Sequence, residues 1–159
     1  DVPLDFDSMR SIGSGLGSGG LAAYDDTVCP VRIAETFTRF LFVESCGQCP
    51  PCKLHSGDIS GTLTRIDRGE ADAGDLQDIL VRCSMVTDGQ RCGLPDGVRT
   101  LVPSLIAEFR SEFETHLNGG GCPYQRDIVL PKISGYEPAS GFEFDRRHAL
   151  KRPDWTYAD

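Results

Sequence analysis

Three cysteines at a fixed interval are the residues of this chain best placed to do chemistry. Cys46, Cys49 and Cys52 lie in the run Glu-Ser-Cys-Gly-Gln-Cys-Pro-Pro-Cys-Lys, a spacing that brings three thiols to one side of a tight loop. Three thiolates from one loop, with a fourth from elsewhere, suit a cubane iron–sulfur cluster held by four cysteines. Cys92, in a short loop of its own, is the expected fourth ligand. The pattern predicts a [4Fe–4S] centre and a role in electron transfer.

Zinc and disulfide bonds are the alternatives for these cysteines. Structural zinc held by four cysteines usually takes two C-x-x-C pairs, whereas this chain has one triple and one single cysteine. The acidic start of the sequence has no basic and apolar leader, so we expect a reducing compartment that keeps thiols free. The cluster is favoured over both, and zinc leaves a second hypothesis open: a non-enzymatic interaction domain stapled by metal.

Composition limits the class of protein. The chain has 159 residues, 39% hydrophobic and 25% charged, as expected of one soluble globular domain. The net charge of −8 argues against nucleic-acid binding, which needs clustered Lys and Arg. No apolar run approaches the length of about 18 residues that a spanning helix needs, so no direct membrane insertion is expected. We expect a cytoplasmic protein, with peripheral attachment to a membrane complex left open. The missing initiator Met suggests a fragment of something longer.

Apolar residues recur at three- and four-residue intervals in four segments, as in amphipathic helices. The predicted helices begin at Pro30, cover 57–68, begin near Asp72 and cover roughly 98–117. The predicted fold class is therefore mainly α: a small four-helix bundle with the cluster-binding loop at one end. Both cysteine loops leave helix ends, so they can meet there.

Polar and proline residues refine these boundaries. Asp72 and Asp75 have the spacing of a capping box, which predicts a helix start. Pro50 and Pro51 are expected to exclude helix from the cysteine loop. Pro103 is expected in the first turn of the fourth helix, where proline is tolerated.

Two flanking segments differ from the bundle. Residues 11–20 are rich in glycine and contain a formal G-x-G-x-x-G, but no apolar strand precedes it and no helix follows directly, so a connector is favoured over a dinucleotide site. Residues 123–159 combine aromatics and prolines with balanced charge, which predicts an extended arm laid over a partner surface. The expected organisation is a Gly-rich connector at 1–28, the bundle at 29–118 and an extended tail at 119–159.

The remaining cysteines and histidines receive no cluster role. Cys83 lies on the apolar face of the third predicted helix, where a thiol behaves as a small hydrophobe. Cys29 and Cys122 precede prolines in predicted loops, and their pairing is left open. His55 is expected to be a solvated loop residue or a neighbour of the cluster, and His116 a last-turn cation. Paired carboxylates, a Ser/His/Asp set and a phosphate loop with Lys are missing, which argues against hydrolysis and phosphoryl transfer.

The run Glu44–Lys53, followed by the lone Cys92 before a final helix, resembles the C-terminal part of the NADH-binding flavoprotein subunit of respiratory complex I. The same module resembles parts of NAD-linked formate dehydrogenases and NAD-reducing hydrogenases. The glycine run 13–20 is similar to that family's junction between a ubiquitin-like domain and the bundle. The similarity covers roughly Pro3 to Cys122, and Lys53 stands where the family often has Arg.

The resemblance implies a function and a ligand set. Cys46, Cys49, Cys52 and Cys92 would hold a [4Fe–4S] cluster that takes single electrons from a flavin mononucleotide reduced by NADH. FMN and NADH are expected only on a flavin domain preceding Asp1. That domain and neighbouring redox subunits are the expected partners. The chain is thus predicted to be the electron-relay module of an NADH dehydrogenase-type oxidoreductase (NADH:quinone or another acceptor), inactive alone.

Overall fold

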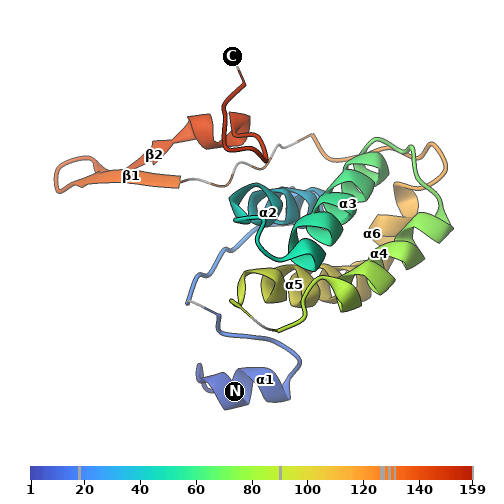
Figure 1. Cartoon of the computed structure of the whole chain (residues 1–159), viewed down its shortest axis with the longest axis horizontal. Coiled ribbons are helices and arrows are strands. Elements are labelled where there is room, and N and C mark those ends of the chain that lie inside the picture. Colours follow the sequence, from blue (N-terminus) through green and yellow to red (C-terminus); the bar gives the residue numbers. More distant parts are fainter. Residues whose placement is uncertain (18, 90, 126–127, 129, 131, 159) are drawn as a thin grey trace.

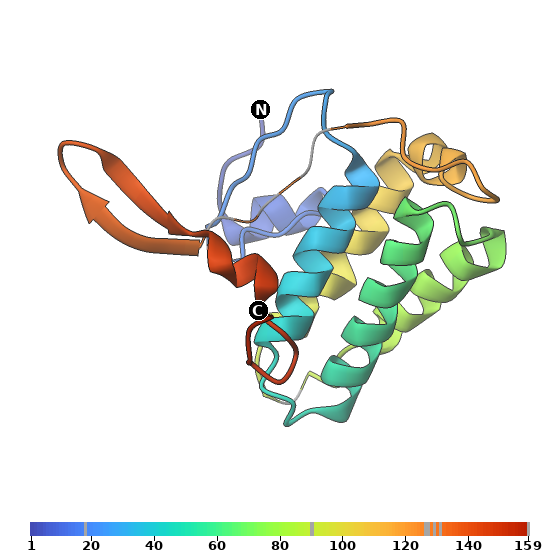
Figure 2. The ribbon, with the colours of Figure 1, turned by 90° about the horizontal axis from the view of Figure 1, so that it is seen from above.

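Four main helices form a bundle in the computed structural model, which describes residues 1–17, 19–89, 91–125, 128, 130 and 132–158. In the views of Figures 1 and 2, α2 lies beside both α3 and α5, and α4 closes the bundle between them. The mainly α fold class is confirmed. No helix among the described residues is long and apolar enough to cross a membrane. The helices of this unit are α2 (Pro30–Glu44), α3 (Pro50–Asp67), α4 (Ala73–Met85), α5 (Leu94–Glu108) and the short α6 (Arg110–Thr115).

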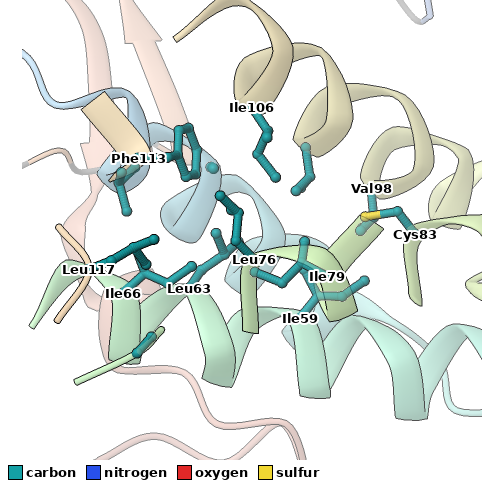
Figure 3. Packing of buried hydrophobic residues seen from close by; sticks show 14 of the residues in the cluster. Ile59, Leu63, Ile66, Leu76, Ile79, Cys83, Val98, Ile106, Phe113 and Leu117 are labelled. Atoms are coloured by element: carbon teal, nitrogen blue, oxygen red, sulfur yellow. The ribbon is translucent and has the colours of Figure 1, made fainter. Parts of the chain in front are cut away.

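The bundle core is built from the apolar stripes of these helices. The side chains point between the helices in Figure 3, and each stripe follows the three- and four-residue interval that places residues on one face of a helix. Cys83 is part of this core at 1% exposure, as its position in the sequence predicts. The largest fully buried apolar side chains are Phe113, Ile59, Leu63, Ile66, Ile79, Ile106, Val31, Val43, Val86, Val98 and Val102.

Two of the expected helix starts illustrate what sequence rules can decide. The Asp72 side chain accepts hydrogen bonds from the backbone N–H groups of Gly74 and Asp75, and the Asp75 side chain accepts from the N–H of Asp72, which confirms the capping box. The prediction that Pro50 and Pro51 exclude helix is wrong, because both lie in the first turn of α3. First-turn N–H groups have no intrahelical acceptor, so proline loses nothing there.

The fourth predicted helix is divided into two. α5 begins at Leu94, with Pro95 in its first turn, so Pro103 lies inside the helix and not at its start as predicted. The helix is interrupted at Phe109, where φ is −115° and ψ is 37°, and α6 follows. Burial of Val102, next to Pro103, keeps this part of α5 against the core despite the missing N–H.

The flanks contain structure that the sequence did not predict. The helix α1 (Phe6–Ser11) has no buried residue. β1 (Lys132–Glu137) and β2 (Gly141–Asp145) form an antiparallel hairpin that projects from the bundle, followed by the 3-10 helix η1 (Arg146–Leu150). Both strands are largely exposed on both faces. Without a buried face, neither strand needs the strict apolar alternation by which strands are recognised.

The end of the chain returns to the bundle. The Trp155 indole N–H donates to the carbonyl of Val43 at 2.8 Å, and the Arg39 guanidinium donates to the carbonyl of Lys151 at 3.0 Å. The Lys151 ammonium lies 2.7 Å from the carboxylate of Glu44. These contacts attach the last residues to the C-terminal half of α2, close to the first cysteine loop.

Candidate metal centre

The first cysteine loop is a short link between two helix ends. α2 ends at Glu44, and the N–H of Ser45 closes its last turn by donating to the carbonyls of Leu41 and Phe42. Gly47 then has a φ of +74°, a left-handed conformation that glycine adopts at little cost. Cys49 precedes the first turn of α3. The loop is therefore turned back on itself with both ends fixed by helices.

All four cysteines predicted to be ligands line one cavity of about 180 Å³. Cys46 and Cys49 come from the first loop, Cys52 from the first turn of α3, and Cys92 from the link between α4 and α5. All four have free thiols. The other lining residues are Glu44, Ser45, Val86, Thr87, Asp88, Arg91, Leu94 and Pro95.

The cavity is closed by the bundle on one side and open on the other. Cys52 is buried at 7% exposure, Cys49 is half-buried, and Cys46 and Cys92 are exposed. The Arg91 guanidinium donates to the Gln48 side-chain carbonyl at 3.0 Å, which joins the two cysteine loops. A group held here would be fixed against the bundle and reachable from outside.

The charges around the cavity explain what the thiols can hold. Burial raises the pKa of the Cys49 thiol, and Asp88, Cys46 and Cys52 raise it further, while Arg91 acts in the opposite direction. Negative charge on these neighbours therefore disfavours ionisation of the Cys49 thiol. A cationic metal centre removes this repulsion, and four converging thiolates are the usual ligands of cubane iron–sulfur clusters. The donor set fits a [4Fe–4S] cluster.

Two further residues support the loop. The Lys53 ammonium donates to the carbonyls of Phe42, Ser45 and Pro153 at 3.0, 3.2 and 3.1 Å, and lies 4.7 Å from the centre of the Phe42 ring. The Lys53 ammonium thus joins α2, the cysteine loop and the tail. These three separate carbonyl contacts do not require the bidentate geometry that an Arg at this position could offer. The Ser45 hydroxyl oxygen lies 3.6 Å from the Cys52 sulfur. The sequence marked Lys53 only as a departure from the family and gave no signal for Ser45.

The other predicted bystanders lie elsewhere. His55 is on α3, and its Nδ1 is buried without a partner among the described residues, so the expectation of a solvated loop histidine is wrong. His116 is the C-cap residue of α6, so it lies at a helix end as predicted, but it is fully buried next to Cys29. Burial raises the pKa of Cys83 to about 12, which makes this thiol inert.

Comparisons with known proteins place this site in context. Residues 32–116 match the model of the family described as the NADH-ubiquinone oxidoreductase-F iron-sulfur binding region. The F-type subunit (F 2) of the NADH-quinone oxidoreductase of Rhizobium meliloti (strain 1021) is 36% identical over 124 residues, which are 78% of this chain and 30% of that protein. The F-type NADH-quinone oxidoreductase subunit of Mycobacterium tuberculosis (strain H37Rv) is 36% identical over 131 residues, 82% of this chain and 29% of that protein.

A hydrogenase subunit is also similar. The NADP-reducing hydrogenase subunit HndC of Solidesulfovibrio fructosivorans is 32% identical over 123 residues, 77% of this chain and 25% of that protein. The chain thus spans under a third of the length of these curated relatives. The matches confirm the resemblance that the cysteine pattern indicates.

Proposed function

Because the chain belongs to the family of the NADH-ubiquinone oxidoreductase-F iron-sulfur binding region, we propose that Cys46, Cys49, Cys52 and Cys92 hold a [4Fe–4S] cluster. The observation that carries this assignment is that these four free thiols line the same cavity, although they come from the first cysteine loop, the first turn of α3 and the α4–α5 link. When bound, such a cluster supplies a site that is oxidised and reduced one electron at a time.

The surrounding residues would tune that site. Val86, Leu94 and Pro95 form an apolar part of the wall, which limits solvent access and favours the cluster state of lower charge. Arg91 contributes a positive charge at the rim, and Glu44 and Asp88 contribute negative charges. The N-terminal ends of α3 and α5 meet the cavity at Cys52 and Leu94, where the helix dipole favours an anion.

We further propose that the complete protein is an NADH dehydrogenase-type oxidoreductase and that this part relays electrons. The electrons would come from a flavin mononucleotide, reduced by NADH on a preceding domain, and would leave toward neighbouring redox subunits. The names of the relatives support this context. The division into a connector (1–28), a cluster-binding bundle (29–118) and a tail (119–159) belongs to the same proposal.

The ligand assignment is tested by four single substitutions to serine, at Cys46, Cys49, Cys52 and Cys92. Each protein is purified anaerobically, and its iron, acid-labile sulfide and visible absorbance are measured. Each substitution should remove or convert the cluster, because serine replaces a soft thiolate by a harder and much less acidic hydroxyl.

Cys83→Ala is the matched control, since it removes a thiol that is 1% exposed in the core and does not line the cavity. It should keep the full iron content. If Cys92→Ser kept its iron and Cys83→Ala lost it, the assignment would be wrong. A circular dichroism spectrum of each variant separates loss of iron from loss of the fold.

A further inference from the structure

A group of side chains of the types that ligate metals lies at the opposite end of α2 from the cysteine loop. The ligand atoms of Cys29, Asp67, His116 and Cys122 all lie within 4.8 Å of one another. Cys29 immediately precedes α2, whose 15 residues separate it from Ser45 at the other end. At 1.5 Å per residue, that is about 22 Å. This group is therefore distinct from the cavity that holds the four predicted cluster ligands.

His116 has the orientation of a metal ligand. Its Nδ1 lies 2.7 Å from the backbone carbonyl of Glu112, which can only accept, so Nδ1 carries the proton. The lone pair is then on Nε2, which faces the Cys29 sulfur at 3.4 Å. The ring is fully buried. A histidine that donates one ring N–H to a backbone carbonyl and presents the other nitrogen inward is the usual arrangement at metal sites.

The spacing of the donors fits one tetrahedral ion. Zinc–sulfur bonds of about 2.3 Å and zinc–nitrogen bonds of about 2.0–2.1 Å put neighbouring donors of a tetrahedron about 3.5–3.8 Å apart. The distance of 3.4 Å between the Cys29 sulfur and Nε2 of His116 is close to this value. The other donor atoms lie within 4.8 Å of one another, so they would need to move together by only about 1 Å to bind the same ion.

The charges of the group also balance around a dication. Two thiolates would neutralise Zn²⁺. The remaining carboxylate of Asp67 is paired with the Arg32 guanidinium at 3.0 Å, with both side chains about three-quarters buried. A buried charge is tolerated when it is paired in this way.

The backbone that carries Cys122 is fixed in place. The N–H of Asn118 donates to the carbonyl of Ala71, and the N–H of Gly119 donates to the carbonyl of Gly69, both at 2.9 Å. Gly69 has a φ of +75°, and a Cβ on it would lie 2.9 Å from the backbone nitrogen of Gly121. Only glycine permits this close approach between the α3–α4 link and the segment leading to Cys122.

We propose that Cys29, His116, Cys122 and Asp67 bind one structural Zn²⁺ ion. Binding forms two Zn–S bonds, one Zn–N bond and one Zn–O bond, and releases the two thiol protons to solvent. The ligands come from the start of α2, the end of α3 and the segment after α6, so the ion would fix the point at which the chain leaves the bundle.

The test uses the whole chain, purified anaerobically with a reductant and supplied with one equivalent of Zn²⁺. X-ray absorption at the zinc edge is blind to iron and reports the zinc ligands directly. Two sulfur neighbours at about 2.3 Å and two nitrogen or oxygen neighbours at about 2.0–2.2 Å are expected. Four sulfur neighbours would place the zinc at the other cysteines, and failure to retain zinc would mean that the group is only hydrogen-bonded. Either result overturns the proposal.

Substitutions separate the two metal sites. Cys122→Ser should weaken zinc binding at least tenfold and keep the iron, whereas Cys92→Ser should lose iron and keep zinc. Cys83→Ala should keep both. If Cys92→Ser lost the zinc as well, the proposal would fail, whatever happened to the assignment of the cluster. Should Cys122→Ser not fold, the zinc-edge spectrum of the unsubstituted chain still decides.

Discussion

Replacing Lys53 by methionine removes an ammonium that joins α2, the cysteine loop and the tail. The Lys53 ammonium donates two half-buried hydrogen bonds, to the carbonyls of Phe42 and Ser45, and one exposed hydrogen bond, to the carbonyl of Pro153. Each half-buried bond contributes about 1 kcal/mol, and the contact with the Phe42 ring about 0.5 kcal/mol. Water replaces the exposed bond. We expect the free energy of unfolding to fall by about 2–3 kcal/mol.

The assay is thermal unfolding of anaerobic protein at matched iron content. For a chain of this size, 1 kcal/mol corresponds to about 2–4 °C, so the midpoint should fall by roughly 4–12 °C. Iron should also be released to a chelator more quickly, because the carbonyl of Ser45 adjoins the cysteine loop. Lys53→Arg keeps the charge and several donors, and it should lose less than about 1 kcal/mol.

Lys132→Met is the control, since Lys132 is an exposed lysine on β1. The free energy of unfolding of this variant should change by about 0.5 kcal/mol or less. If Lys53→Met and Lys132→Met unfolded at the same temperature, the idea that the ammonium fixes the loop would be refuted.

Three further substitutions test other parts of the account. Burial raises the pKa of Glu35, so folding favours the protonated form of this carboxyl group. The protein therefore loses stability as pH rises through the raised pKa of the folded state. Glu35→Gln should raise the melting temperature at about pH 8 more than at about pH 5. Arg91→Gln removes a positive charge from the cavity rim and should make the reduction potential more negative by some tens of millivolts in a redox titration, roughly the Coulomb energy of a screened charge. Trp155→Ala removes the hydrogen bond to Val43 and should lower stability by about 1–2 kcal/mol in thermal unfolding while iron content stays full; loss of iron would mean that the tail takes part in holding the cluster.

Much of the bundle could be predicted because its helices are amphipathic and their ends carry local signals. The capping box at Asp72 depends on residues three positions apart, and the start of α2 at Pro30 follows from proline's place in a first turn. The error at Pro50 arose because the rule that proline breaks a helix interior was applied to a position in the first turn of α3, where proline is tolerated. The hairpin at 132–145 was missed because exposed strands carry no buried face from which a register could be read.

The grouping of side chains from distant segments was the least predictable part. The triple cysteine motif is local, so its shared loop follows from spacing alone. Cys92 was expected as the fourth ligand because it lies in a short loop of its own, and the family resemblance implies the same four residues. Cys29 and His116 are 87 positions apart, and neither has a sequence context that marks a ligand. Only the packing of α2 against α6 brings them together. The contacts of Lys53 also depend on packing, because they require the carbonyls of Phe42 and Ser45, at the C-terminal end of α2, to lie near the start of α3.

The most direct test of the central claim is quantitative electron paramagnetic resonance of the anaerobic, chemically reduced chain. A [4Fe–4S] cluster held by Cys46, Cys49, Cys52 and Cys92 predicts about one unpaired electron per chain, with about four iron atoms and four sulfides, and a brown colour that bleaches on reduction. A colourless protein without a signal, with zinc bound by these four cysteines, would contradict the account and favour a metal-stapled interaction domain.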